Sequence, residues 1–188
     1  MSMIAAGQRV ILASASPRRR ELLSYIISEF DVIPSGIDEE ATGAPDDQVR
    51  QLAADKALDI AGQYPDALVI GADTLVAIDD RVLGKPSDEA EAADMLRLLS
   101  GREHRVYTGM AVANNGRVKT DVNMTLVQFA TLSNEEIREY ISTGEPMDKA
   151  GAYGIQGYCG KFIVGIRGDY FNVMGRPLNM LYNMLKEI

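Results

Sequence analysis

The stretch Leu12-Ala13-Ser14-Ala15-Ser16-Pro17-Arg18-Arg19-Arg20-Glu21-Leu22-Leu23 decides how the first part of the chain folds. An apolar run at residues 10–13 predicts a buried strand, and the pattern after it predicts a helix. Ser16 suits the helix cap, and Pro17 suits the first helical position, where a missing N–H costs nothing. The exposed N–H groups of such a helix start, with serine hydroxyls and a guanidinium beside them, favour binding of an anion. The alternative is a capped helix whose arginines are only solvated.

Beyond this stretch, apolar runs and helical patterns alternate as far as Gly101, and mostly strands follow. This order predicts an α/β fold in which helices flank a mixed, elongated central sheet with a cleft. With no linker, repeat or low-complexity segment in the sequence, we expect a single domain over residues 1–188. Strands are expected at residues 9–13, 30–34, 67–70, 75–78, 105–113, 118–132 and 161–166. Helices are expected at residues 17–27, 47–61, 88–100 and 134–143, and from Pro177 onward.

Composition excludes several classes of protein. A length of 188 residues is ample for a real core, and the net charge of −8 argues against nonspecific binding to nucleic acid or to an anionic membrane. The single cysteine and single histidine exclude an internal disulfide and the usual Cys/His zinc sites. The sequence has neither a signal-peptide pattern nor an apolar stretch of membrane-spanning length, so we expect a soluble cytoplasmic protein.

Asp73 is the strongest candidate for a catalytic residue. It lies in Gly71-Ala72-Asp73-Thr74, between two apolar runs that predict buried strands. A carboxylate in such a place has to be paired, hydrogen-bonded or bound to a cation, because burying it bare is very costly. Carboxylates at strand ends serve as metal ligands or as bases for water. The alternative is an aspartate that closes a turn between strands.

Three other charged residues occupy suggestive positions. Glu39 belongs to an acidic loop, residues 36–45, which could deliver a carboxylate to a metal ion or could be a solvated connector. Lys56 lies in a predicted amphipathic helix, where a lysine is more often plain surface. Lys85, between Gly84 and Pro86, is held in a loop and could meet a phosphate, although a loop lysine is more often just exposed.

Glycines recur every third residue in Ala150-Gly151-Ala152-Tyr153-Gly154-Ile155-Gln156-Gly157-Tyr158-Cys159-Gly160. The spacing makes a helix improbable and predicts a long loop whose backbone can approach a ligand closely. Tyr153 and Gln156 are the side chains of this loop best suited to stack on a base and to recognise its hydrogen-bonding edge. His104 has no partner histidine or cysteine nearby in the sequence, so we expect it to be structural or exposed.

Taken together, these segments resemble the Maf family of nucleotide pyrophosphatases. The resemblance covers nearly the whole chain in the family's order. It lies in residues 12–23, 71–74, 84–86, 99–101, 104–108, 144–146 and 148–157.

The resemblance implies a hydrolase of nucleotide metabolism that cleaves nucleoside triphosphates between the α and β phosphates with help from a divalent cation. It also implies the inosine triphosphate pyrophosphatase-like fold, with a cleft between two lobes. The loop at residues 148–157 resembles the branch that acts on dTTP and UTP. Family roles, carried onto the matching positions, make Asp73 the general base with Lys85 and Glu39 beside it in catalysis. The same transfer makes the substrate-binding residues Ser14, Arg18, Lys56, Thr74 and Gln156.

The chemistry of these residues agrees with the roles that the resemblance implies. The carboxylate of Glu39 would be repelled by the triphosphate of the substrate unless a cation lay between them. A Mg²⁺ or Mn²⁺ ion held by Asp73 and Glu39 meets this requirement. The amide of Gln156 is complementary to the O4 and N3–H edge that uracil and thymine share.

Two rival functions remain open, and one position departs from the family pattern. The rivals are a pyrophosphatase for 7-methyl-GTP or noncanonical purine nucleotides, and a nucleotide-binding regulator of septum formation. Arg176 stands where the family's dTTP/UTP branch usually has leucine, and we expect only a local packing difference there. The resemblance is compatible with a homodimer, for which the sequence itself offers no interface.

Overall fold

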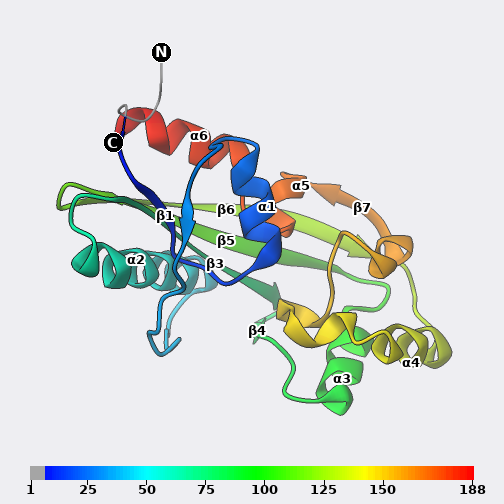
Figure 1. The fold of residues 1–188 in the computed structure, drawn as a ribbon. Coiled ribbons are helices and arrows are strands. Elements are labelled where there is room, and N and C mark those ends of the chain that lie inside the picture. Colours follow the sequence, from blue (N-terminus) through cyan, green and yellow to red (C-terminus); the bar gives the residue numbers. More distant parts are fainter. Residues whose placement is uncertain (1–6) are drawn as a thin grey trace. The chain divides into compact units, whose positions relative to one another are not determined.

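A mixed sheet of seven strands runs through residues 7–188, the residues that this computed structural model describes (Figure 1). The strand order is β2-β1-β3-β5-β6-β7, with β4 paired to β3. Strand β1 is parallel to β2 and β3, whereas the pairs β3–β4 and β6–β7 are antiparallel. The predicted α/β fold with a mixed sheet is confirmed, and the cleft between two lobes stays a prediction. The strands are β1 Val10–Leu12, β2 Asp31–Val32, β3 Leu68–Ile78, β4 Arg81–Leu83, β5 Glu103–Asn114, β6 Arg117–Phe129 and β7 Ile163–Arg167.

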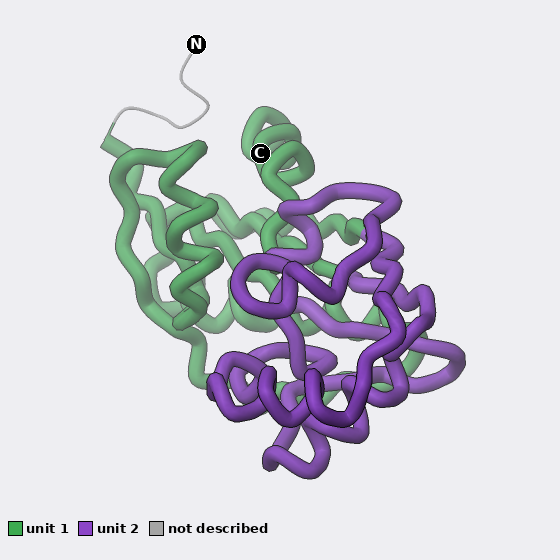
Figure 2. The backbone as a smooth tube through the Cα atoms, turned by 90° about the vertical axis from the view of Figure 1, so that its right-hand side faces the viewer, with its two compact units in different colours: residues 1–73, 108–123, 175–188 green, residues 74–107, 124–174 purple. Residues whose placement is uncertain are grey.

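The chain divides into two compact units, which Figure 2 shows in different colours. The first unit contains the chain up to Asp73, together with Thr108–Asn123 and Gly175–Ile188. The second contains Thr74–Tyr107 and Met124–Met174. The single domain expected from the sequence stays a prediction.

The predicted N-terminal strand and helix are both present in the first unit. Helix α1, Pro17–Ser24, has Pro17 in its first turn, and the Ser16 side chain accepts a hydrogen bond from the Arg19 backbone N–H. Successive side chains of strand β1 point to opposite faces of the sheet. Val10 and Leu12 pack with residues of α1 and of α6, Leu178–Glu187, whereas Ile11 packs with residues of α2, Pro45–Gln63. Figure 1 shows α2 on one face of the sheet and α1 and α6 on the other.

Two glycines let α2 lie unusually close to the sheet. A Cβ on Gly71 in β3 would stand 2.3 Å from the Ala53 carbonyl oxygen, and one on Gly109 in β5 would stand 2.1 Å from that of Val49. No side chain fits at such distances, so the helix backbone rests almost directly on the two strands. The face of α2 that carries Ala53, Lys56, Ala57 and Ile60 is thereby buried.

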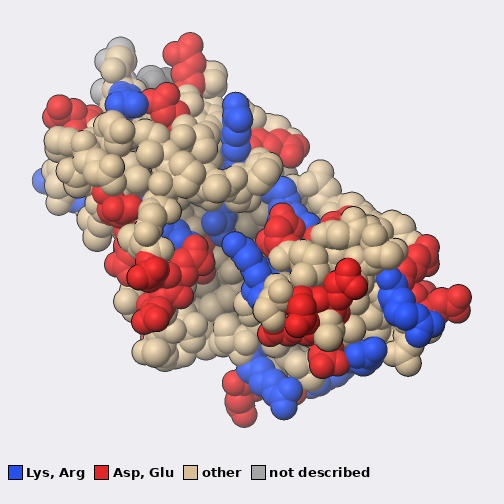
Figure 3. Space-filling model, turned by 60° about the horizontal axis from the view of Figure 1, so that its bottom comes forward, with Lys and Arg blue, Asp and Glu red and all other residues tan. Residues whose placement is uncertain are grey.

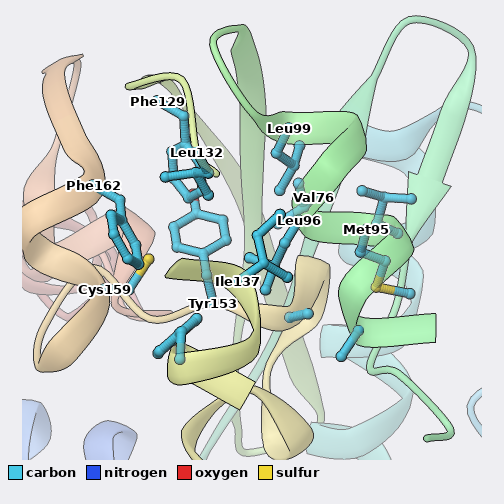
Figure 4. Packing of buried hydrophobic residues seen from close by; sticks show 14 of the residues in the cluster. Val76, Met95, Leu96, Leu99, Phe129, Leu132, Ile137, Tyr153, Cys159 and Phe162 are labelled. Atoms are coloured by element: carbon cyan, nitrogen blue, oxygen red, sulfur yellow. The ribbon is translucent and has the colours of Figure 1, made fainter. Parts of the chain in front are cut away.

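The second unit encloses its own apolar core (Figure 4). Its helices are α3 Glu89–Leu99, α4 Asn134–Ser142 and α5 Tyr170–Val173, with the 3-10 turns η1 Glu145–Asp148, η2 Ala150–Ala152 and η3 Tyr158–Phe162. The helix expected at residues 134–143 is present as α4, and Ser133 and Glu136 form a capping box at its start. The glycine-rich stretch is a chain of short turns, and Gly151 adopts φ +68° where a Cβ would stand 2.9 Å from the Val76 side chain.

Three local expectations are corrected. The two apolar runs around Asp73 form the single eleven-residue strand β3, so Asp73 does not close a turn. The helix expected at residues 88–100 begins one residue later, at Glu89, because Asp88 is its cap and accepts the Glu91 N–H at 2.8 Å. Strand β2 spans only two residues of the expected range 30–34, and both of its side chains are exposed.

The surface is mixed in charge. On the face shown in Figure 3, Asp and Glu side chains are interspersed with Lys and Arg. Such a pattern does not favour nonspecific binding of a polyanion such as DNA. Among the helices of residues 7–188, none has the length and apolar character to cross a membrane.

Replacing Gly109 tests the close approach of α2. We expect Gly109→Ala to lower the free energy of unfolding by at least about 1–3 kcal/mol, because the new methyl group overlaps the backbone of Val49. Gly62→Ala in the same helix is the matched control, since nothing lies within 4 Å of a Cβ there, and it should stabilise by about 0.5–1 kcal/mol. Urea titrations of both variants measure the difference. Equal stabilities would contradict the tight contact.

Candidate active site

The start of α1 presents hydroxyl and N–H groups beside a guanidinium. The Ser16 N–H donates to Ser14 Oγ at 3.3 Å, and Arg19 Nη1 donates to the same oxygen at 3.4 Å. Arg19 also donates from Nη1 to the Ala72 carbonyl at 2.9 Å and from Nε to the Gly175 carbonyl at 3.0 Å. One guanidinium thus joins α1, β3 and the segment before α6.

The special position of Arg19 was not predicted from the sequence. The family resemblance gives the substrate-binding role to Arg18, which is partly buried in the first turn of α1. Three successive arginines point in different directions around a helix, and only the surrounding carbonyl groups reveal which one faces the protein. The motif itself was the available signal, because it contained all three.

Lys56 lies between two carboxylates. Its Nζ is 2.7 Å from Asp73 Oδ1 and 2.8 Å from Glu39 Oε1. Lys56 and Asp73 are 7% and 8% exposed, whereas the Glu39 side chain is 53% exposed at the edge of the group. The alternative that Lys56 is plain surface is therefore wrong. The expectation that a buried Asp73 must be paired is confirmed.

The close packing of α2 explains how Lys56 reaches Asp73. Ala53 and Ala57, one turn apart on α2, both lie within 3.1 Å of the position that a Cβ on Gly71 would occupy. Lys56 lies on the same buried face of the helix. Asp73 lies two residues after Gly71 in β3, so both residues are on the same face of the strand. The side chain therefore spans a short distance to the carboxylate.

These residues share one electrostatic environment. Burial lowers the pKa of the Arg19 guanidinium, while the charges of Asp73 and Glu39 act to raise it and that of Arg18 acts to lower it. Arg19 consequently interacts electrostatically with both carboxylates and with Arg18, its neighbour in α1. Ser14, Arg18, Arg19, Glu39, Lys56 and Asp73 all belong to the first unit.

The pair Asp73 and Glu39 also fits a divalent cation. Both carboxylates already contact one positive group, the Lys56 ammonium, and oxygen ligands are those that Mg²⁺ and Mn²⁺ prefer. Residues 7–188 contain no group of three or more His, Cys, Asp or Glu side chains that could hold a metal ion. A cation here would therefore need oxygen atoms from substrate or water, as is usual for Mg²⁺.

Three other predicted residues belong to the second unit. Thr74 follows Asp73 in β3 and is partly buried, Lys85 is exposed in the loop after β4, and Gln156 is exposed between η2 and η3. The Gly151 N–H donates to the Gly84 carbonyl at 2.9 Å, so the loop of Lys85 adjoins the turn that precedes Gln156.

The expectation that Tyr153 stacks on a base is wrong. Tyr153 is 4% exposed, its hydroxyl is 2.7 Å from His104 Nε2, and its ring meets that of Phe129 edge-on at 4.8 Å (Figure 4). Burial lowers the pKa of His104 to about 4, so the imidazole is neutral at pH 7. The prediction that His104 is structural agrees with this contact, and the whole group belongs to the core.

The family model described as "Maf-like protein" matches residues 9–188. The chain belongs to the Maf family. A protein of Thermococcus gammatolerans named dTTP/UTP pyrophosphatase is 52% identical over 175 residues, covering 93% of this chain and 94% of its own. A protein of Clostridium novyi with the same name is 50% identical, covering 96% and 97%. The solved structure of the Staphylococcus aureus Ham1 protein has a TM-score of 0.49 at 14% identity over 96% of this chain and 99% of that one, and it is too distant to inform the site of this Maf protein.

Replacing Tyr153 tests its role in the core. We expect Tyr153→Phe to lower the free energy of unfolding by about 1–3 kcal/mol, because it leaves the buried His104 Nε2 without its partner. The KM for a nucleotide substrate should not change, since the hydroxyl is buried against His104. Chemical denaturation and steady-state kinetics on the same preparation measure both. Unchanged stability would contradict the buried hydrogen bond, and an increased KM would indicate that the hydroxyl contacts the nucleotide.

Proposed function

We propose that this chain hydrolyses dTTP and UTP between the α and β phosphates, releasing the nucleoside monophosphate and pyrophosphate. The observation that carries the proposal is the buried Asp73 carboxylate, held by Lys56 in the same unit as the polar start of α1. A carboxylate fixed in this way can take a proton from water, which hydrolysis of an anhydride requires. The two relatives named above, 52% and 50% identical over nearly the whole chain, support the choice of substrates.

The first unit supplies the groups that bind phosphate. The N–H groups at the start of α1 and the Ser14 hydroxyl offer hydrogen bonds, and the helix dipole favours negative charge there. Arg18, Arg19 and Lys56 add positive charge that neutralises the triphosphate and the charge growing on the leaving group. Arg19 is already oriented by two backbone carbonyls, so little rearrangement is needed when phosphate binds.

Asp73 acts as the general base in this proposal. Its Oδ1 accepts a hydrogen bond from Lys56 Nζ, and the carboxylate retains further lone pairs for the proton of water. Asp73 and Glu39 would together hold a Mg²⁺ or Mn²⁺ ion. That ion would supply charge neutralisation and a lower pKa for bound water. Lys56, which contacts both carboxylates, keeps them close to one another.

The residues of the second unit are assigned to base recognition and to the leaving group. Gln156 presents an amide at an exposed turn, where its donor and acceptor can meet the N3–H and O4 edge of uracil or thymine. Thr74 assists substrate preference, and Lys85 would neutralise the departing pyrophosphate. We propose that the enzyme acts in the cytoplasm, where it would also remove modified pyrimidine nucleotides. The homodimer implied by the family resemblance stays a prediction.

A substrate panel tests the reaction and its base. With Mg²⁺ present, we expect pyrophosphate release from UTP and dTTP, and far less from CTP, GTP and 7-methyl-GTP. Asp73→Asn should reduce turnover of UTP at least about 100-fold, because the base for water is lost, while UTP still binds. Asp94→Asn is the matched control, since that side chain is 80% exposed on α3.

Other outcomes of the panel have definite meanings. Release of pyrophosphate mainly from 7-methyl-GTP would instead support the rival function, a pyrophosphatase for 7-methyl-GTP. Saturable binding of UTP with no release from any nucleotide would instead favour the regulator of septum formation. Unchanged turnover in Asp73→Asn would remove Asp73 as the base.

Replacing the Gln156 amide tests recognition of the base. We expect Gln156→Glu to lower kcat/KM for UTP about tenfold or more, because the amide donor is lost and a charge is placed near the O4 edge. Stability should not change, since the residue is exposed. Gln51→Glu, an exposed glutamine of α2, makes the same change of charge elsewhere and should leave kcat/KM unaltered. Equal use of UTP by Gln156→Glu would exclude the recognition role.

A further inference from the structure

Arg176 is a buried cation with no partner. The residue is 0% exposed, and within residues 7–188 none of Nε, Nη1 and Nη2 finds a hydrogen-bond acceptor. It lies in the first unit, between Gly175 and the N-cap residue of α6, Pro177. Burying a guanidinium without an acceptor or a counter-charge is strongly unfavourable. The local packing difference expected from the sequence is therefore accompanied by an unpaired charge.

The neighbour of Arg176 is Arg19. Burial, and then the positive charge of Arg19, lower the pKa of the Arg176 guanidinium to about 9. Arg19 is bound to the Gly175 carbonyl, one residue before Arg176, and to Ser14 Oγ at the start of α1. Arg176 thus follows directly in the chain the residue that Arg19 links to the start of α1.

The carboxylates of the site do not neutralise Arg176. Asp73 and Glu39 act on Arg19 and contact Lys56, whereas within residues 7–188 the charge that acts on Arg176 is that of Arg19. Arg176 therefore has no counter-charge among residues 7–188, and an anion that is not part of the protein would supply one.

A structural role does not account for this arrangement. A buried arginine that stabilises a fold does so through bidentate ion pairs or carbonyl contacts, and Arg176 makes neither. Its aliphatic portion could be replaced by an apolar side chain of similar length. What an apolar side chain could not supply is the positive charge.

We propose that Arg176 is a positioning residue for polyphosphate, whose buried charge acts through Arg19 and strengthens binding of polyanions at the start of α1. The guanidinium need not touch the ligand, because charges in a poorly polarisable interior interact more strongly than charges in water. A bound triphosphate or pyrophosphate would supply the missing counter-charge, so that binding and folding stabilise one another. The inference rests on the proposed function only for the identity of the polyphosphate.

The experiment compares Arg176→Met with the unaltered chain in buffer free of phosphate and divalent metal. Thermal unfolding without ligand should occur at an equal or higher Tm in Arg176→Met, because an unpaired buried charge has been removed. Calorimetric titration with inorganic pyrophosphate should give a Kd weakened roughly tenfold, the size expected for one nearby charge in the protein interior. The Tm rise at saturating pyrophosphate should shrink accordingly.

Two further variants sharpen the test. Arg176→Lys keeps a positive charge and should retain most of the affinity for pyrophosphate. Arg20→Met removes an exposed arginine of α1 and should change the Kd less than twofold, because solvent screens its charge. In steady-state assays with UTP, Arg176→Met should raise KM and leave kcat largely unchanged.

Either of two results would overturn the proposal. If Arg176→Met unfolds at a lower Tm or fails to fold, the guanidinium is structural. If Arg176→Met folds well and binds pyrophosphate as tightly as the unaltered chain, the charge has no part in anion binding. Neither measurement requires hydrolysis. A chain that binds pyrophosphate through Arg176 but releases none from UTP would therefore refute the proposed function and leave this inference standing.

Discussion

The close contact between α2 and β3 is the constraint on which the rest of the candidate site depends. Because Gly71 has no side chain, the backbone of α2 at Ala53 rests directly on the strand, and Lys56 is carried to within 2.7 Å of Asp73. A buried ion pair is seldom the most stable solution, since well-packed apolar residues often do as well or better. Removing one member of the pair, however, leaves the other charged and buried, which costs about 3–5 kcal/mol. Lys56 therefore makes it possible to keep a carboxylate inside the protein, where it can work as a base.

Arg19 links three segments that are far apart in the sequence. Its guanidinium contacts Ser14, Ala72 and Gly175, so the helix start, the strand that carries Asp73 and the segment before α6 are fixed relative to one another. All three contacts lie within the first unit. An anion-binding group held by backbone carbonyls loses little freedom when phosphate arrives. The orientation of the phosphate-binding groups is thus largely prepared by folding.

Much of the fold could be predicted from the sequence, because local rules dominate it. The cap at Ser16, the capping box at Ser133 and the alternation in β1 all depend on residues within a few positions of one another. Asp73 could be identified because a carboxylate between apolar runs violates the pattern around it. Tyr153 could not be assigned correctly, since its partner His104 is 49 residues away and only the folded chain brings them together. Arg19 and the burial of Lys56 were missed for the same reason: periodicity gives the face of a helix, but not the atoms that the face meets.

The charges of the first unit indicate how stability and binding are balanced. Lys56 and Asp73 compensate each other, and Glu39 joins them from a more exposed position. Arg176 has no such compensation, and Arg19 beside it adds a charge of the same sign. A folded chain carrying this excess is less stable alone than it would be with an apolar side chain at Arg176. The excess becomes favourable only when a polyanion is present, since the same positive field that opposes folding attracts the ligand. The buried charge of Arg176 is in this sense uncompensated until an anionic ligand binds.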